Sequence, residues 1–583
     1  MRKIVVSFLF TITVIGVYGQ VDMGADYYYI GEYTFAKKYL EEGLTKNPTK
    51  ANFFLGEIAF KEGDMEKAES YYNKGLAADP NSLINQIGLA KLMLKKDTKN
   101  GDLALFDIQR KNSKNIDVVI AVGRAYLDNG MFEKAESKLR DAKTINNKNA
   151  KVNLFDGDII IAKNAKDLGN AAGKYEQAIY FDPNNCLSYF KLAEIYEKID
   201  WSSSIENLKT AKGICPEYMI AYRLLGRIYT QNGRYPQAID AYKTYFSSTD
   251  HYTVDDFEKY ARAYFFSDSL EAAKALVERG LKIDPNHFVL NRYLMYIYAK
   301  TDNFEAGLEQ EKKFFALRPD ASGYISMDYT MYASILKKMG RYNEAIEQYN
   351  TAIQLDPGKT ELYDEAADMA KAKKDYGLAA AYYKALIAKK AEHGKETNPE
   401  YTDNLMDIYS LSYNYYSAGA TIAKNPQLAE ELMKNNTIIN NIIAENTGVN
   451  TDSLKTNISY FSRQYALYNL YKADSVVDIL IKQTPSDIYT GYRLKALIKH
   501  AINPAVEMGA AKPYYEKVVE IITAQQDIKP SAKVVLLEAY NYLGYYYYLI
   551  GDKPNIILYW NKVLELKPED ENAKKVLDEW NKK

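Results

Sequence analysis

Hydrophobic residues recur along most of the chain at the spacing that places them on one face of a short helix. The clearest case is the stretch from Tyr329 to Pro357, whose first half follows the i, i+3, i+4, i+7 rule with Tyr329, Tyr332, Ala333 and Leu336. Gly340 ends this first helix, and a second amphipathic stretch ends at Asp356-Pro357, where the proline disfavours helical geometry. Neither helix can bury its apolar face alone, so the pattern predicts two antiparallel helices that stack against further copies.

The same unit recurs from the N-terminal to the C-terminal part of the chain. Between Met219 and Tyr252 the corresponding places hold Tyr222, Leu225, Gly226, Tyr229, Gly233, Tyr235, Ala238 and Tyr242. Between Thr49 and Pro80 they hold Leu55, Gly56, Gly63, Ala68, Tyr72 and Pro80. The spacing aromatic-x2-Leu-Gly/Ala-x2-Tyr, then Ala-x3-aromatic, then Pro, over 34 residues resembles the tetratricopeptide repeat.

The resemblance implies an all-α protein, a right-handed superhelical solenoid of about fifteen antiparallel helix pairs with a C-terminal capping helix. We expect its N-terminal part over residues 20–388, an irregular helical pair over 389–453 and its C-terminal part over 454–570. The irregular pair includes a longer helix from Leu428 to Glu445, and the pattern of a regular pair returns from Leu454 to Pro485. Residues 571–583 form the expected cap, with its apolar face made of Ala573, Val576, Leu577 and Trp580.

Small residues recur in both helices of a unit, Gly or Ala in the first helix and Ala in the second. A Gly or Ala in the first helix marks a place where two backbones approach closely, and a larger side chain there would cost roughly 1 to 3 kcal/mol by overpacking. The large aromatic residues, including most of the 54 Tyr, then fill the remaining seam. We therefore expect most aromatic residues to be packing residues.

The first nineteen residues have the pattern of a secretory signal peptide. A short basic start at Met1-Arg2-Lys3 precedes an apolar run from Ile4 to Val17, and Gly19 supplies a small residue at the expected cleavage point. The alternative is a membrane anchor, but the apolar run is short for a bilayer span. This pattern predicts an exported protein, periplasmic or secreted, with no transmembrane segment after cleavage.

Composition and motifs exclude several classes of function. Lys+Arg 75 against Asp+Glu 76 leaves a net charge of -1, which removes the basic footprint of a nucleic-acid binder. The sequence has no GxxxxGK[ST] loop, no GxSxG elbow and no HExxH pair. His251 and His287 lie at neighbouring repeat junctions, but two His without a third ligand make a poor zinc site, and we expect both to be solvated turn residues. We expect no catalytic residues, no metal and no cofactor.

Two classes of function remain. The resemblance implies a non-catalytic scaffold of the bacterial cell envelope that binds proteins or peptides on the concave face of its superhelix. The alternative is an enzyme or glycan-binding protein with its site in the irregular region 389–453.

The chain has two cysteines, Cys186 and Cys215. Cys186 opens the first helix of its unit and Cys215 ends the second, so antiparallel packing brings them side by side, and an oxidising compartment favours a disulfide. The alternative is two buried thiols.

The binding surface is predicted from the residues that follow the buried stripe of each first helix, which the family resemblance assigns to the concave face. In three consecutive units this rule selects Arg223, Arg227, Glu258, Arg262, Phe265, Arg292 and Tyr296. Arg grips carboxylates bidentately and stacks on aromatic rings, so the patch fits an acidic or C-terminal peptide segment. The alternative is a solvated charged stripe.

Overall fold

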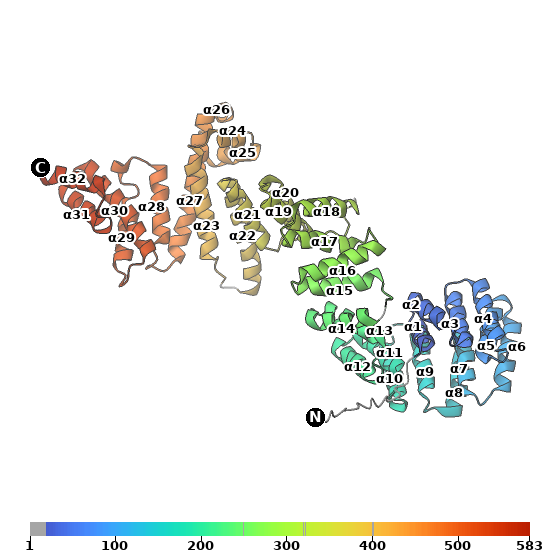
Figure 1. Cartoon of the computed structure of the whole chain (residues 1–583). Coiled ribbons are helices and arrows are strands. Elements are labelled where there is room, and N and C mark those ends of the chain that lie inside the picture. Colours follow the sequence, from blue (N-terminus) through green and yellow to red (C-terminus); the bar gives the residue numbers. More distant parts are fainter. Residues whose placement is uncertain (1–18, 249, 319, 321, 399–400, 583) are drawn as a thin grey trace, which may run out of the picture. The chain divides into compact units, whose positions relative to one another are not determined.

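The computed structural model describes residues 19–248, 250–318, 320, 322–398 and 401–582. These residues form thirty-two α-helices and one short 3-10 helix, with no strand among them (Figure 1). The chain divides into two compact units after Ile297. The expected signal peptide lies outside the described residues apart from Gly19, the N-cap of α1. Within the described residues, no helix combines the length and apolar character that crossing a membrane requires.

The first unit, through Ile297, contains the helices α1 (Gln20–Tyr29), α2 (Tyr33–Gly43), α3 (Pro48–Lys61), α4 (Met65–Ala78), α5 (Leu83–Lys96), α6 (Thr98–Lys111), α7 (Ile116–Asp128), α8 (Phe132–Asn146), α9 (Ala150–Lys163), α10 (Leu168–Phe181), α11 (Cys186–Glu197), α12 (Trp201–Ile214), α13 (Met219–Gln231), α14 (Tyr235–Ser248), α15 (Val254–Phe266), α16 (Leu270–Ile283) and most of α17 (Phe288–Lys300).

The second unit begins at Tyr298 and contains the helices α18 (Phe304–Ala316), α19 (Ser326–Lys338), α20 (Tyr342–Leu355), α21 (Glu361–Ala372), α22 (Tyr376–Thr397), α23 (Leu405–Ile422), α24 (Pro426–Met433), α25 (Asn436–Glu445), α26 (Thr451–Thr456), α27 (Ile458–Gln483), α28 (Thr490–Ile502), η1 (Val506–Met508), α29 (Lys512–Thr523), α30 (Pro530–Ile550), α31 (Lys553–Leu566) and α32 (Glu571–Lys582).

Local sequence explains where the helices of a pair separate. Gly63 adopts φ 84° and Gly340 φ 73° between first and second helices, a left-handed conformation that costs glycine little. Asp64 and Asp97 then cap the following helix, each side chain accepting the backbone N–H three residues ahead. Asp268, with φ 57°, occupies the same turn position in a unit that has no glycine there.

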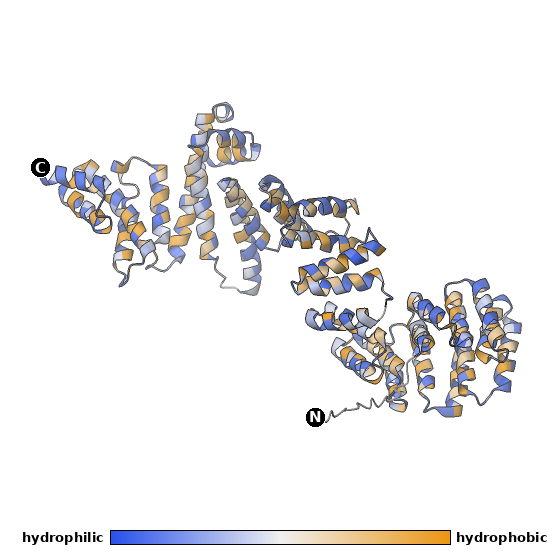
Figure 2. Cartoon of the chain, viewed as in Figure 1, coloured by the Kyte–Doolittle hydropathy of each residue, from blue (hydrophilic) through white to orange (hydrophobic). Residues whose placement is uncertain are grey.

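The seams between helices have the predicted small-against-aromatic packing. The ring of Tyr72 on α4 lies between Gly56 of α3 and Gly88 of α5, and a Cβ at either glycine would lie 2.5 Å from it. Gly226 stands against Tyr242 in the same way, at 2.8 Å. Figure 2 shows the resulting alternation of hydrophobic and hydrophilic residues around the helices. The prediction of an all-α repeat fold is confirmed.

The irregular region is a regular pair with an insertion. α23 packs along α27, where the Ser412 hydroxyl donates to the Ala473 carbonyl at 2.9 Å, and α24 to α26 are inserted between these two helices. The predicted pair over 454–485 is therefore wrong: α27 is one 26-residue helix, because no Gly or Pro interrupts it. The predicted single helix from Leu428 to Glu445 is also wrong, because Asn435 accepts the Thr437 and Ile438 N–H groups and starts a new helix.

At the C-terminal end, α32 packs on α31 through Ala573 and Leu577, which are buried, with Val576 and Trp580 partly buried beside them. This face is the one that the sequence pattern selected.

Candidate functional site

The first helix pair of the first unit contacts helices that follow it by 160 to 190 residues. The Lys191 ammonium of α11 donates to the Tyr29 carbonyl at 3.0 Å, and the Arg223 guanidinium of α13 donates to Glu32 at 2.8 Å. Residues of α1 and α2 also share one buried apolar cluster with α11 to α15. Figure 1 shows α1 and α2 beside α11 and α13. The helix pairs of this unit therefore close on themselves and enclose an interior.

Arg223 is the central side chain of this closure. Its Nε donates to Asp256 at 2.6 Å, and its guanidinium carbon lies 4.9 Å from the centre of the Phe35 ring on α2. Burial disfavours the charged guanidinium, but Asp256 and Glu32 outweigh this effect and raise the pKa of Arg223 above its ordinary range. His251 adds a second contact, with Nε2 3.0 Å from Glu42. His251 is buried, so the prediction that it is a solvated turn residue is wrong.

A cavity of about 580 Å³ opens on the inner side of this unit, and we call it cavity A. Its walls come from the first helices of six consecutive pairs, α1, α3, α5, α7, α9 and α11. Most of its lining is apolar and includes Phe53, Ile84, Ile87, Ile120, Leu154 and Leu187. At the helix N-terminal ends, Lys50 pairs with Asp22 and Lys151 pairs with Asp117. Cavity A is thus an apolar hollow edged by neutralised charges.

A second cavity of about 510 Å³, cavity B, lies over the opposite ends of several of the same helices. Tyr28, Tyr29 and Arg124 line both cavities, and the Arg124 guanidinium carbon lies 4.7 Å from the centre of the Tyr29 ring. Tyr28 donates its hydroxyl to Glu57 at 3.1 Å. Since these groups are held by partners, they form a fixed partition between the two cavities.

Most of the charges in cavity B are paired. Asp158 accepts from Arg124 at 2.8 Å and from Lys191 at 2.9 Å. Burial opposes the ionisation of Asp158, but Lys191 and Arg124 outweigh it and keep the pKa of that carboxyl below its usual range. Glu197 binds the Arg227 guanidinium with two hydrogen bonds of 3.1 and 2.7 Å.

Two charged residues of cavity B, Lys198 and Glu194, have no ion pair among the residues that the structure describes, and Glu194 is the less exposed of the two. Glu194 lies on α11, it lines cavity B and the small gap beside Arg223, and within the described residues its carboxyl makes no hydrogen bond or ion pair. Burial raises the pKa of Glu194 to about 7, against the charges of Lys191 and Arg227 and together with those of Glu197 and Glu32.

The seven predicted binding residues lie on α13, α15 and α17 but do not share one accessible surface. Arg223 and Arg227 are bound to acidic side chains of this chain, and Phe265 and Tyr296 are buried, 4% and 2% exposed. Glu258 is also buried. The side chains at these positions contact neighbouring helices or the first helix pair, α1 and α2. They therefore interact with other parts of this chain instead of a bound peptide.

The remaining two predicted arginines stack on aromatic rings. Arg262 lies 5.8 Å from the ring centre of Phe266, and Arg292 lies 4.8 Å from that of Phe288. That these residues bind a partner stays a prediction.

Sequence reasoning missed the residues of the two cavities, although the same rule finds them. Arg223 and Arg227 stand three before and one after the small residue Gly226. The same offsets around Gly56, Gly123, Gly157 and Ala193 select Phe53, Glu57, Ile120, Arg124, Leu154, Asp158, Phe190 and Glu194. All of these line a cavity or the adjoining gap. Arginines gather only in the part of this pattern on α13, α15 and α17, which is why that part stands out in the sequence.

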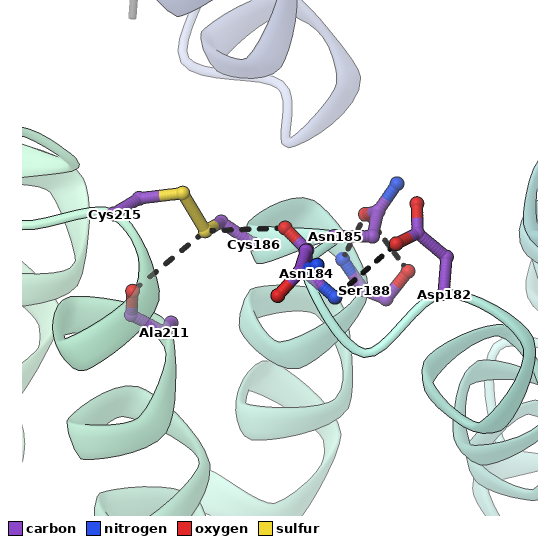
Figure 3. The surroundings of a disulfide bond; sticks show 7 residues. All are labelled: Asp182, Asn184, Asn185, Cys186, Ser188, Ala211 and Cys215. Carbon is purple, nitrogen blue, oxygen red and sulfur yellow. Dashed lines mark hydrogen bonds between the residues drawn. A yellow bond between two sulfur atoms is a disulfide. The ribbon is translucent and has the colours of Figure 1, made fainter. Parts of the chain in front are cut away.

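Cys186 and Cys215 form a disulfide in the structure, with an S–S distance of 2.02 Å and Cα atoms 6.5 Å apart. Figure 3 shows the bond joining the start of α11 to the residue after α12, with Cys186 Sγ 3.7 Å from the Ala211 carbonyl oxygen. Asn185 caps α11 by accepting the Ser188 N–H, and Asn185 and Cys186 both line cavity A. The disulfide therefore ties one wall of cavity A to the outer helix of its pair.

No group of three or more His, Cys, Asp or Glu suited to a metal ion occurs in the part of the chain that the structure describes.

Comparisons with known proteins point to one family. The model described as "Tetratricopeptide repeat" matches residues 21–82 and 208–249, and the model described as "TPR repeat" matches residues 333–365. The TPR repeat-containing protein YpiA of Bacillus subtilis (strain 168) is 22% identical over 336 residues, which cover 51% of this chain and 77% of the relative. The small glutamine-rich tetratricopeptide repeat-containing protein 2 of Mycosarcoma maydis is 35% identical over 83 residues, covering 14% of this chain and 24% of the relative.

Two solved structures of similar chains are also described as TPR proteins. The C-terminal part of a TPR repeat-containing protein from Cytophaga hutchinsonii is 22% identical with a TM-score of 0.36, covering 55% of this chain and 99% of that one. YrrB, described as a TPR protein with an unusual peptide-binding site, is 15% identical with a TM-score of 0.30, covering 35% of this chain and 99% of that one.

Proposed function

Because the chain is a tetratricopeptide repeat protein, we propose that it is a non-catalytic scaffold that binds a protein through a peptide segment inside its first unit. The observation that carries the proposal is cavity A, whose walls come from the first helices of six consecutive pairs. A hollow with an apolar floor and a few polar groups at its edge is the usual form of a ligand site in a protein.

The lining of cavity A fits apolar side chains of a bound segment. Burying one Leu or Phe side chain among Ile87, Ile120 and Leu154 contributes about 1.5 to 3 kcal/mol. The Lys50–Asp22 and Lys151–Asp117 pairs lie where a segment enters, and they present donors and acceptors for its backbone. A segment with two or three apolar residues between polar flanks is the partner that this geometry favours.

A variant that fills cavity A tests the proposal. Ala121 lines the cavity, so Ala121→Trp blocks it, whereas Lys209→Trp places the same side chain on the exposed face of α12. Proteins captured from the native source by the wild type should be lost with Ala121→Trp and kept with Lys209→Trp. A photo-crosslinker at Ile120 should also label the captured partner. Equal capture by both variants, with no crosslink at Ile120, would contradict the proposal.

We also propose that the protein is exported to the cell envelope. The basic start and apolar run at residues 1–19 support export, as does the use of both cysteines of the chain in one bond. Cell fractionation followed by mass spectrometry of the N-terminal peptide tests it. A cytoplasmic protein that retains Met1-Arg2-Lys3 would contradict export.

A further inference from the structure

The second unit carries a row of partly exposed tyrosine rings on α23. Tyr409, Tyr413 and Tyr416 follow the i, i+4, i+7 rule, so they share one face of the helix. The ring centres of Tyr409 and Tyr413 lie 6.0 Å apart with planes 12° from parallel, and those of Tyr413 and Tyr416 lie 6.2 Å apart. Tyr413 is 44% exposed, and the other two are partly exposed. We call these three residues the tyrosine row.

The tyrosine row adjoins an ion pair between the next two first helices of the unit. Arg493 of α28 donates to Glu538 of α30 through Nε at 3.2 Å and through Nη2 at 2.7 Å. Burial raises the pKa of Tyr416, the charge of Glu538 raises it further and that of Arg493 opposes the rise, so both charged groups lie close to this ring. The row and the ion pair therefore lie side by side on the first helices of three consecutive pairs, α23, α28 and α30.

These residues hold hydrogen-bond donors that the chain leaves unused. Within the described residues, the three hydroxyls of the tyrosine row and Nη1 of Arg493 make no hydrogen bond. The carboxylate beside them is already engaged, because Glu538 accepts from Arg493 and also from the Tyr515 hydroxyl at 3.2 Å. A ligand that fits this site presents apolar faces to the rings, and it brings hydrogen-bond acceptors and few donors.

A proline-rich segment has this chemistry. Each proline carries an apolar ring and a carbonyl acceptor but no backbone N–H. In the polyproline II conformation the segment uses none of its carbonyls internally, and it is preformed, so binding orders little additional chain. One turn of this helix is three residues and about 9 Å long, and packed helices stand about 8 to 10 Å apart. Successive turns of such a segment can therefore meet successive first helices.

We propose that the tyrosine row and Arg493 form a further binding site, which takes a proline-rich segment of a partner protein in the polyproline II conformation. All of its residues belong to the second unit, so the site does not depend on cavity A. A neutral oligosaccharide can also stack on aromatic rings, but each of its hydroxyls is a donor as well as an acceptor. It matches an excess of donors less well than a chain of prolines does.

The test presents two sets of octapeptides to the full-length protein. One set has two prolines three residues apart and random residues elsewhere, and the other has Ala in place of both prolines. All peptides are N-acetylated and C-amidated. Tyr413→Ala is compared with Tyr471→Ala, because Tyr471 is a similarly exposed tyrosine on α27, at 52%. Neither hydroxyl makes a hydrogen bond within the described residues, so we expect both variants to fold, and urea unfolding checks this.

We expect the wild type and Tyr471→Ala to retain the proline set several-fold better than the Ala set, and Tyr413→Ala to lose this preference. For the best single peptide, a double variant with Tyr409→Phe and Tyr413→Phe keeps both rings and removes two donors. It should weaken binding about 5-fold or more, as expected for two hydrogen bonds.

Two results with peptides would overturn the inference: equal retention of both sets by the wild type, or a proline preference that survives in Tyr413→Ala. An array of neutral oligosaccharides provides the third. Oligosaccharides that are retained by the wild type and lost with Tyr413→Ala, in the absence of a proline preference, would assign the tyrosine row to glycans instead.

Discussion

Removing the Arg223 guanidinium should open the first unit where its first helix pair closes on α13. In Arg223→Met, Asp256 loses a hydrogen bond of 2.6 Å and keeps those from the Thr253 backbone and hydroxyl groups. The Asp256 side chain is 3% exposed, and leaving one charge of a buried pair without its partner costs about 3 to 5 kcal/mol. Because the Thr253 hydrogen bonds remain, we expect the lower end, about 3 kcal/mol.

The pair of Arg223 with Glu32 contributes less to the free energy of unfolding than the pair of Arg223 with Asp256. Glu32 is 35% exposed, so water screens its pair with Arg223, and exposed pairs contribute at most about 1 kcal/mol. The loss of the Arg223 stack on Phe35 adds a similar amount. The sum is about 3 to 5 kcal/mol, which is a large fraction of the stability of a typical domain.

Hydrogen exchange with mass spectrometry localises the effect, and urea unfolding of the same variants gives its size. In Arg223→Met we expect faster exchange in α1, α2 and α13 and unchanged exchange in α30, which lies in the second unit and serves as the internal reference.

Arg110→Met is the matched control, because Arg110 and Asp107 form an exposed pair on α6, 63% and 56% exposed. It should cost less than about 0.5 kcal/mol. A loss below about 1 kcal/mol in Arg223→Met, or unchanged exchange in α1 and α2, would refute the reasoning. A double variant with Asp256→Asn should show coupling between the two positions, and strict additivity would count against a direct contact.

Three further outcomes follow from the described contacts. Gly56→Ala should destabilise the first unit by about 1 to 3 kcal/mol because its Cβ would lie 2.5 Å from an aromatic ring, whereas Gly173→Ala, which meets open space on a helix, should stabilise by up to about 1 kcal/mol; thermal unfolding distinguishes them. Reduction of the Cys186–Cys215 bond, with a sequence separation of 29, should lower the free energy of unfolding by up to about 3.5 kcal/mol, and complete alkylation of both thiols in the unfolded, unreduced protein would show that the bond is absent in solution. The pKa of Glu194 is raised to about 7 in the folded state, whereas the unfolded state releases this proton near pH 4.5, so the free energy of unfolding should fall as pH rises from about 4.5 to 7. Glu194→Gln should therefore be more stable than the wild type by about 1 kcal/mol at pH 8 and by little at pH 4. Equal gains at both pH values would contradict this prediction.

The repeat and its seams could be predicted from the sequence because their determinants are local. Gly226 and Tyr242 stand 16 residues apart in neighbouring helices, and the same spacing joins Gly56 to Tyr72 and Gly544 to Trp560. Helix periodicity and turn residues act within one unit, so each copy repeats the same signal.

The binding surface could not be predicted in the same way because it depends on contacts between distant units. Arg223 looks available when α13 is considered alone, but Glu32, 191 residues earlier, occupies it. Phe265 follows a concave-face offset and is nevertheless buried, against Tyr293 and Tyr296 of α17. Glu194 stands one residue after the small residue Ala193, as Arg227 does after Gly226, and it lines cavity B. Both the closure of the unit, at Arg223, and the packing against the next first helix, at Phe265, decide which of these positions stay accessible.

That closure also has a consequence for synthesis. Glu32 leaves the ribosome 191 residues before Arg223, and translation proceeds at about 5 to 20 residues per second, so the two meet only after roughly 10 to 40 seconds. During this interval the apolar residues of α1 and α2 that pack on the later helices lack that cover, and Phe35 contacts only its own helix pair, where it stacks on Tyr27. The nascent chain therefore exposes the apolar surface of α1 and α2 for longer than an ordinary solenoid would, because in such a solenoid each repeat is covered by the next repeat. A holding chaperone that binds the first forty residues of the folded region should raise the yield of this protein more than that of repeat proteins without such a closure.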